Sequence, residues 1–260
     1  MDADFGEYPW QAAILQKDQY DNIYTCGAAL IDPSHLITAT HCINKFRPEQ
    51  LRVRLGEWDV HSDSEPYTNV EMDVLDIKYH PEFHAGNLYN DIAVVKLDGV
   101  LDFQENPHIS PVCLPDVFQV LKRFSPVRNA SVVPQDFSDH RCWVSGWGKD
   151  QFGVTGAYQN ILKEVDVPVM SHGQCQQQLR QTRLGQQFLL HPGFLCAGGE
   201  EGKDACKGDG GSPLVCQMDG VWQLAGIVSW GVGCGTRDIP GVYVRVGHYT
   251  DWIQEMILQG

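Results

Sequence analysis

Two side chains that can transfer protons, His41 and Asp91, precede a glycine-rich segment in which a hydroxyl nucleophile would complete a hydrolytic site. In such sites a histidine accepts the proton of a serine, and a buried aspartate holds the imidazole tautomer and stabilises its charge. The segment reads ACKGDGGSPLVC over residues 205–216. Its only hydroxyl belongs to Ser212, whereas Gly210 has no side chain. The acid–base pair is therefore present, and the nucleophile has to be located.

The charge of the chain excludes several kinds of partner. There are 19 basic and 33 acidic residues, which gives a net charge of −14. Such a surface repels phosphate backbones and anionic lipids, so we expect no nucleic acid and no membrane surface as partner. No apolar run approaches the roughly 18 residues of a membrane span. With 260 residues, the chain is long enough to bury a large core.

The cysteines indicate an oxidising, extracellular compartment. There are 9, none in a Cys-x-x-Cys pair, so zinc-finger and redox spacings are absent. Asn129 begins a glycosylation sequon, which agrees with secretion. The first residues, Met1 to Asp4, do not resemble a signal peptide. We therefore expect a chain cut from a longer secreted precursor, with Met1 as an added start.

Short β-type runs separated by turn residues dominate the chain. Residues 51–55 alternate apolar and charged side chains, and residues 93–97, 223–230 and 241–246 are further candidate strands. Only the tail, from residue 250 onward, has a firmly helical apolar stripe. This pattern predicts an all-β barrel or sandwich with a C-terminal helix.

Residues 115–141 form a segment longer than the roughly 12 to 15 residues of most structureless loops. The segment carries the sequon and several basic residues. Two interpretations remain: a surface loop without a specific role, and a partner-docking or nicking site.

Several short motifs occur in a fixed order along the chain. They are TATHC (38–42), NDIAVVKL (90–97), CWVSGWG (142–148), the segment 205–216, SWG (229–231) and PGVY (240–243). Together they resemble the trypsin-like serine proteases from Gly6 to nearly the last residue. The resemblance implies one domain over residues 1–260, built of two six-stranded antiparallel β-barrels with an active cleft between them. The halves would span about 1–114 and 142–249, followed by a C-terminal helix at 250–258.

The resemblance assigns His41 and Asp91 to the first two positions of a catalytic triad and Gly210 to the third. The family nucleophile lies four residues after a cysteine, directly after an aspartate, three before a proline and six before a cysteine. Position 210 meets all four conditions and Ser212 meets none. Ser212 is also followed by Pro213, which restricts its backbone. The nucleophile position therefore contains glycine.

A glycine cannot form an acyl-enzyme, although the N–H groups of Gly208 and Gly210 can still form an oxyanion hole. Loss of such a serine lowers turnover by about 10⁶. We therefore expect a pseudoenzyme with no functional catalytic residue. An engineered inactivation is the alternative origin of Gly210, but Ser212 departs from the family pattern as well, which favours natural divergence.

The resemblance also implies a specificity pocket with Asp204 at its base and with Gly231 and Gly241 leaving it open. A carboxylate there favours arginine or lysine. The pocket either still binds basic side chains without cleaving them or is a relic that binds nothing.

Related proteases are activated when a new amino terminus pairs with the aspartate before the nucleophile, here Asp209. The Ile-Val-Gly-Gly stretch that supplies this terminus is not in the sequence. We therefore expect Asp209 to turn toward His41 or Lys207, with a collapsed oxyanion loop.

Eight cysteines alone permit 105 pairings. The resemblance selects Cys26–Cys42, Cys142–Cys216, Cys175–Cys196 and Cys206–Cys234. Cys113 is left over. In related zymogens this position is tied to the pro-segment, so the resemblance implies a link to a missing N-terminal partner, and a free buried thiol is the alternative.

Four acidic residues lie in a loop where some trypsin-like domains hold calcium: Glu57, Asp59, Asp63 and Glu65. Carboxylates suit calcium, but the spacing is not a clean match to that site. The loop either binds calcium or is simply a solvated acidic loop, and no other cofactor is expected.

A narrower resemblance is carried by FGEYPW (5–10), GKDQFG (148–153), TRLG (182–185), LHPGFLCAGG (190–199) and GKDACKGDGGSPLVC (202–216). These are similar to arthropod clip-domain serine protease homologues of the masquerade-like and prophenoloxidase-activating cofactor type. The resemblance implies a secreted haemolymph cofactor in melanisation and innate immunity. Its expected partners are a cascade protease, a zymogen or prophenoloxidase, together with its own clip domain, which is absent from residues 1–260. The alternatives are an active trypsin-like endopeptidase and an adhesion or microbial-surface recognition module.

Overall fold

The computed structural model describes residues 1–19, 22–62, 64–115, 136–149 and 156–259. Most of the predicted long loop, residues 116–135 with the sequon at Asn129, lies outside the described residues. Asp63 of the predicted calcium loop lies outside them as well.

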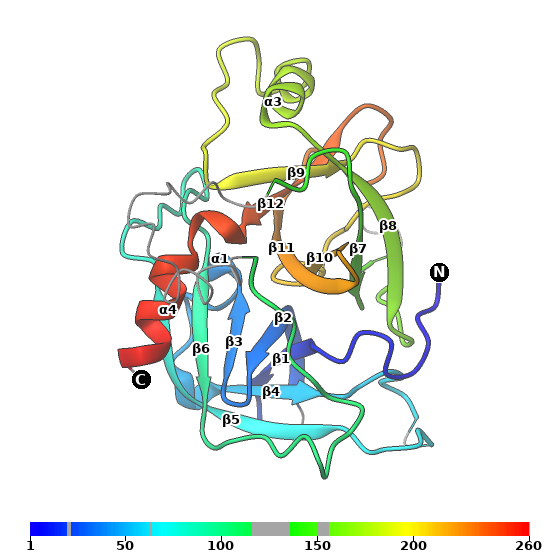
Figure 1. Ribbon diagram of the computed structural model, residues 1–260, viewed down its shortest axis with the longest axis vertical. Helices are drawn as coiled ribbons and strands as arrows, with labels where there is room; N and C mark the ends of the chain where they lie inside the picture. Colours follow the sequence, from blue (N-terminus) through cyan, green and yellow to red (C-terminus); the bar gives the residue numbers. More distant parts are fainter. Residues whose placement is uncertain (20–21, 63, 116–135, 150–155, 260) are drawn as a thin grey trace.

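The described residues form two closed antiparallel barrels of six strands each (Figure 1). The first barrel has the strand order β1-β2-β3-β6-β5-β4, and the second has β10-β11-β12-β9-β8-β7, which is the same connectivity. The strands of the first barrel are β1 Gln11–Lys17, β2 Asn22–Asp32, β3 His35–Thr38, β4 Leu51–Leu55, β5 Val70–Tyr79 and β6 Ala93–Leu97. Those of the second are β7 Arg141–Gly146, β8 Lys163–Met170, β9 Phe194–Gly198, β10 Pro213–Met218, β11 Val221–Trp230 and β12 Pro240–Arg245. The predicted fold class is confirmed.

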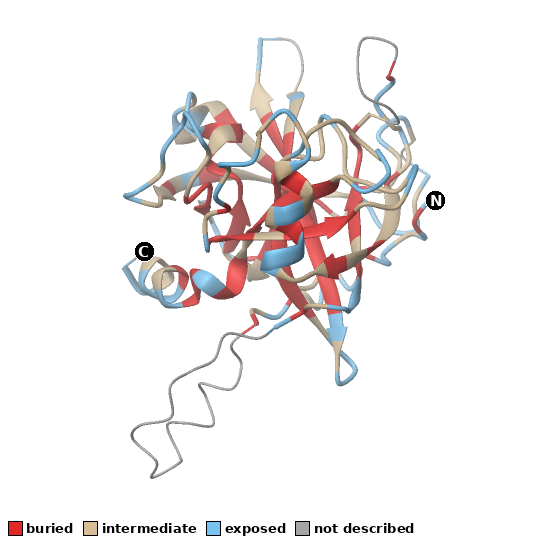
Figure 2. Cartoon of the chain, turned by 90° about the horizontal axis from the view of Figure 1, so that it is seen from above, coloured by how far each residue is buried: buried red, intermediate tan, exposed pale blue. Residues whose placement is uncertain are grey.

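Strand β4 shows how the alternating pattern builds a barrel wall. Leu51, Val53 and Leu55 are each 0% exposed, because every second side chain of a strand points to the same face. Arg52 and Arg54 point outward and pair with acidic side chains of β5. Figure 2 shows the same division throughout, with buried segments inside the barrels and exposed residues at the turns.

The helices are α1 Thr40–Ile43, α3 His172–Arg180 and α4 Thr250–Gln259, with short 3₁₀ turns at Pro48–Gln50 and Val246–His248. Helix α4 agrees with the predicted C-terminal helix, whereas α3 was not predicted. Its sequence signal is a capping box, in which Ser171 accepts from the Gln174 N–H and the Gln174 side chain bonds the Ser171 N–H. None of the helices in the described ranges is long and apolar enough to cross a membrane.

The first residues do not belong to the first barrel as expected. The Ala3 N–H donates to the Leu162 carbonyl at 2.9 Å, and Asp2 forms a bridge with Lys163. The N-terminus therefore lies beside β8 of the second barrel (Figure 1). The largest buried cluster also joins both barrels, since it contains Leu36 of β3 and Ile227 of β11. This cluster therefore connects the two barrels, while two further clusters lie within the second half, around Val144 and around Leu179.

A group of histidines lies where the two barrels meet α4. The His80 ring is 5.3 Å from the Tyr249 ring and 5.0 Å from the Trp252 ring of α4, while His191 stacks on Tyr89 at 4.4 Å. Burial lowers the pKa of both His80 and His191, and nearby Glu82 opposes this shift. The other titratable or charged groups facing this cluster are His172, His248 and Arg245.

We expect the contribution of His80 and His191 to the free energy of unfolding to fall as the pH is lowered from about 7.5 toward 5.5, whereas Asp204, whose pKa burial raises to about 6, contributes with the opposite sign. The lowered pKa values of His80 and His191 mean that the unfolded chain binds more protons than the folded chain just below the ordinary histidine pKa of about 6.5. Thermal unfolding of a His80→Gln/His191→Gln double variant should therefore depend less on pH. His140→Gln, at an exposed position, is the control. Equal pH dependence in all three proteins would contradict the interpretation.

Candidate functional site

The histidine and the aspartate predicted to transfer protons lie together at the junction of the barrels. His41 lies in α1, which is held to β2 by the Cys26–Cys42 disulfide. The Thr40 hydroxyl donates to the Ile92 carbonyl at 2.7 Å, which fixes α1 against the chain just before β6. Asp91 directly precedes this point and is 0% exposed.

The Asp91 carboxylate is fully engaged by His41 and Ser229. Its Oδ1 accepts from the His41 backbone N–H at 2.8 Å, and its Oδ2 lies 2.7 Å from His41 Nδ1. The Ser229 hydroxyl donates to the same Oδ2 at 2.6 Å. Since a carboxylate only accepts, Nδ1 carries the hydrogen and Nε2 is left facing the cleft. The SWG motif contains Ser229, but the sequence alone did not reveal this contact.

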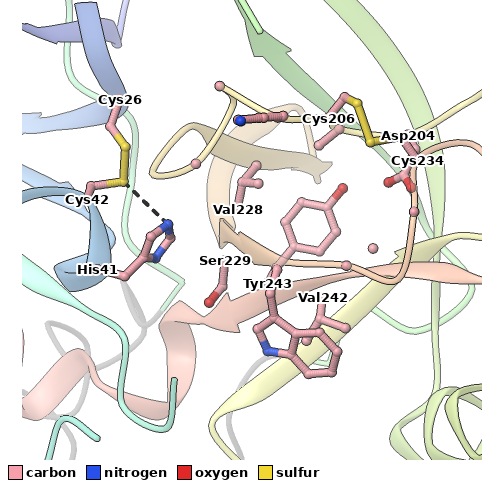
Figure 3. A pocket seen from close by; sticks show the side chains of 18 of the residues that line it. Cys26, His41, Cys42, Asp204, Cys206, Val228, Ser229, Cys234, Val242 and Tyr243 are labelled. Carbon is pink, nitrogen blue, oxygen red and sulfur yellow. Dashed lines mark hydrogen bonds between the residues drawn. A yellow bond between two sulfur atoms is a disulfide. The ribbon is translucent and has the colours of Figure 1, made fainter. Parts of the chain in front are cut away.

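The backbone at Gly210 is held between the two barrels. The Gly27 N–H of β2 donates to the Gly210 carbonyl at 2.9 Å, and the Gly211 N–H donates to the Val228 carbonyl of β11 at 2.9 Å. A Cβ placed at Gly210 would lie 3.2 Å from His41 Nε2. A side chain at position 210 would therefore meet His41 Nε2, which in Figure 3 contacts Cys42 Sγ at 3.8 Å.

Ser212 lies away from the cleft, as its sequence position indicates. It is 0% exposed and does not line the hollow that contains His41. Its hydroxyl is packed against β2, where a Cβ at Gly27 would come within 2.1 Å of it. Ser212 is therefore a buried packing residue.

The expected collapse of the oxyanion loop is wrong. The Lys207 carbonyl accepts from the Lys149 N–H, and the Asp209 carbonyl accepts from the Ser212 N–H, both at 2.9 Å. The peptides are trans, so the following N–H groups, those of Gly208 and Gly210, point the opposite way, toward the cleft that both residues line. No backbone bond in the described chain uses either N–H group.

Two aromatic residues that were not identified from the sequence support this loop. The Tyr24 hydroxyl donates to the Gly208 carbonyl at 3.0 Å. The Tyr158 ring packs so closely on Gly208 that a Cβ there would lie 2.6 Å from it. Gly208 also has a φ of +105°, which favours glycine.

The expected contacts of Asp209 are also wrong. Its carboxylate accepts from the Gly148 N–H at 2.8 Å and from the Cys206 N–H at 2.9 Å, and not from His41 or Lys207. Burial raises the pKa of Asp209, while these two donors lower it. Backbone donors stabilise the carboxylate here, because Gly148 has no side chain to keep it away.

A single hollow of about 420 Å³ extends from His41 to Asp204 (Figure 3). Asp204 Oδ2 accepts from the Gly235 N–H at 3.1 Å, whereas its buried Oδ1 has no partner among the described residues. Burial raises the pKa of Asp204 to about 6. Gly231 and Gly241 line the walls, and a Cβ on Gly241 would come within 2.7 Å of Asp204 Oδ1. Asp204 therefore lies at one end of the hollow with its Oδ1 buried.

The structure contains the four disulfides that the resemblance selected: Cys26–Cys42, Cys142–Cys216, Cys175–Cys196 and Cys206–Cys234. Cys113 is a free thiol in the described part of the chain and is exposed, so the alternative of a buried thiol is wrong. Its carbonyl accepts from the Leu224 N–H at 2.8 Å, which attaches this segment to β11.

The predicted calcium loop is only partly described. Glu57 accepts from Arg54 at 3.0 Å and from the Asn69 amide at 3.1 Å, so its carboxylate is already engaged. Within the described ranges no group of three or more His, Cys, Asp or Glu residues could hold a metal ion. Asp63 lies outside those ranges, and calcium binding at Glu57, Asp59, Asp63 and Glu65 stays a prediction.

Comparison with known proteins agrees with this geometry. The family model described as Trypsin matches residues 1–253. The chain is 46% identical to the inactive CLIP domain-containing serine protease A3 of Aedes aegypti, over 97% of this chain and 50% of that protein. It is 43% identical to phenoloxidase-activating factor 2 of Galleria mellonella, over 98% of this chain and 82% of that protein. It is 35% identical to the protein masquerade of Drosophila melanogaster, over 98% of this chain and 22% of that protein. The chain thus spans half the length of the mosquito relative and less of masquerade.

Proposed function

Because the chain belongs to the trypsin family but has glycine at position 210, we propose that it is a non-catalytic cofactor in an arthropod protease cascade. One observation carries the proposal. The His41–Asp91 pair is intact, yet the residue at position 210, which His41 Nε2 faces, has no side chain. Without a nucleophile no acyl-enzyme forms, so the retained cleft can bind but cannot carry out the two-step hydrolysis of its family.

The relatives support the direction of the proposal. One of them is named an inactive protease and another a phenoloxidase-activating factor. We infer that this chain acts on the same kind of cascade, with a protease, a zymogen or prophenoloxidase as its partner, in melanisation and innate immunity. Secretion into haemolymph is part of the proposal, and the four disulfides support an oxidising compartment.

An N-terminal clip domain is a further part of the proposal. The exposed Cys113 thiol, on a segment attached to β11, is accessible for a disulfide with such a segment. Mass spectrometry of the full-length secreted protein should find Cys113 paired. No observation in the described residues favours an active endopeptidase or a microbial-surface module over this function.

The proposed function is tested with the full-length secreted protein, prophenoloxidase and an active cascade protease. We expect the protein to co-purify with at least one of the two and to increase the phenoloxidase activity that the protease generates. The protein alone should not hydrolyse an arginyl amide. Two results would contradict the proposal. One is hydrolysis of the amide that is lost on His41→Ala, and the other is a reconstituted cascade whose phenoloxidase activity does not change when the protein is added.

A further inference from the structure

We propose that the peptide bond between Arg183 and Leu184 is a cleavage site for a protease that cuts after arginine, and that the cut chain keeps its fold as a two-chain form. The bond lies in residues 181–187, the turn segment, which follows α3 and precedes β9. The inference goes beyond the proposed function, because it concerns a covalent modification of this chain and not the effect of the chain on a cascade.

The turn segment is held at its two ends. Helix α3 ends at Arg180, whose Nε–H donates to the Phe188 carbonyl at 2.8 Å. The Leu190 N–H donates to the Gln176 side chain of α3 at 3.0 Å, which holds the chain beyond Phe188. In Figure 1, α3 and the chain that leads from it to β9 project from the second barrel. A cut within the turn segment therefore opens a projecting loop whose two ends stay attached to α3.

The Arg183 side chain is accessible to a protease. Arg183 is exposed, and among the described residues no hydrogen bond or ion pair holds its guanidinium group. By contrast, Arg52 and Arg54 of β4 form ion pairs with Glu71. A protease that recognises arginine binds this side chain in a specificity pocket. A guanidinium without a partner in its own chain loses no interaction when such a pocket binds it.

The backbone at the Arg183–Leu184 bond has only local hydrogen bonds. The Gly185 N–H donates to the Thr182 carbonyl at 3.1 Å, and the Leu184 N–H donates to the Thr182 hydroxyl at 3.3 Å. Arg183 and Leu184 are the two central residues of this turn. No backbone bond in the described chain uses the Arg183 carbonyl. A protease that binds its substrate as an extended strand therefore has to open only this turn.

Arg237 shows why exposure alone does not make a cleavage site. It is exposed and also lies in a turn, in which the Ile239 N–H donates to the Thr236 carbonyl at 3.1 Å. The Asp238 N–H, at the bond that follows Arg237, donates to the Gly199 carbonyl next to β9 at 2.9 Å. Opening that turn would break a bond to a distant segment, whereas the turn segment has no backbone bond to a distant part of the described chain.

Two disulfides connect the parts of the chain on either side of the bond. Cys142–Cys216 and Cys175–Cys196 each pair a residue before position 183 with a residue after it. Hydrolysis by the protease consumes one water molecule, breaks the C–N bond, and leaves a carboxylate on Arg183 and an amine on Leu184. The two products therefore remain one covalently connected molecule, and the cut does not release any part of the domain.

The test is limited digestion of the full-length secreted protein with trypsin. We expect a fragment that begins with LGQQF, residues 184–188, to separate after reduction and to remain attached before it. The Arg54–Leu55 bond is the matched comparison, because it also joins arginine to leucine but lies in β4, where Leu55 is buried. Cleavage after Arg183 should be at least about 10-fold faster than after Arg54, since exposing β4 requires much more of the fold to open.

Two variants assign the cut to its residue. In Arg183→Gln the LGQQF fragment should be lost. In Arg237→Gln, which removes the other exposed arginine in a turn, the fragment should form as fast as in the native chain. Residues 116–135 contain further basic residues, but cuts there do not produce a fragment that begins with LGQQF.

Absence of the LGQQF fragment from the digest of the native chain overturns this inference, whichever other bonds are cut. Equal rates of cleavage after Arg183 and Arg54 overturn it as well, and so do fragments that separate without reduction. Each of these results leaves the proposed function standing, because that function depends on the absence of hydrolysis by this chain and on the reconstituted cascade.

Discussion

A fluorophosphonate probe should leave the native chain unlabelled and should label Gly210→Ser at the introduced hydroxyl. The serine Cβ would lie 3.2 Å from His41 Nε2, which already faces the position, and Asp91 already orients the imidazole. The N–H groups of Gly208 and Gly210 point into the cleft, where they can stabilise an oxyanion. Since loss of such a serine costs about 10⁶ in turnover, restoring it should raise arginyl amide hydrolysis by at least about 10² even with imperfect geometry.

The controls locate the reacting atom. Ser212→Gly should remain as unreactive as the native chain, because Ser212 is buried and does not line the cleft. Adding His41→Ala to Gly210→Ser should remove the labelling. Labelling of the native chain that disappears in Ser212→Gly would show that the nucleophile is Ser212, and the pseudoenzyme interpretation would then be wrong.

Gly211→Ala should destabilise the protein far more than Gly185→Ala does. The two glycines have nearly the same backbone, with φ values of +80° and +78°, so alanine carries the same left-handed strain of about 1 to 2 kcal/mol at both. At Gly211 the new Cβ would also lie 2.3 Å from the Gly27 carbonyl oxygen and 2.3 Å from Thr38 Oγ1, whereas at Gly185 nothing lies within 4 Å. Overpacking of this kind adds about 1 to 3 kcal/mol.

Urea unfolding of both variants with intact disulfides measures this difference. We expect a loss of about 2 to 5 kcal/mol for Gly211→Ala and of about 1 to 2 kcal/mol for Gly185→Ala. Equal losses would show that the close approach of the two barrels at Gly211 is not a real constraint. The comparison matters for the site, because the same contact places Gly210 beside His41.

Much of the framework could be read from local patterns. The strands at residues 51–55 and 93–97 have the predicted bounds, because alternation and β-branched runs are local signals. Helix α3 was missed, although the Ser171–Gln174 capping box precedes it, because its apolar stripe is weak. Residues 1–3 were placed with the wrong barrel, since their partners at 162–164 are far away in the sequence.

The sequence by itself determined that the nucleophile position has no hydroxyl. The spacing from neighbouring cysteine, aspartate and proline residues locates this position at residue 210, and the absence of a side chain is part of the covalent structure of glycine. The sequence also determined that His41, Asp91 and Asp204 are present. Only the tertiary structure decided the state of the oxyanion loop, since its orientation depends on donors and acceptors from distant segments such as Lys149 and Tyr24. The tertiary structure likewise decided which groups contact Asp209. Every residue except proline has a backbone N–H, so the sequence alone does not show that the N–H groups of Gly148 and Cys206, and not a positively charged group, bind this carboxylate.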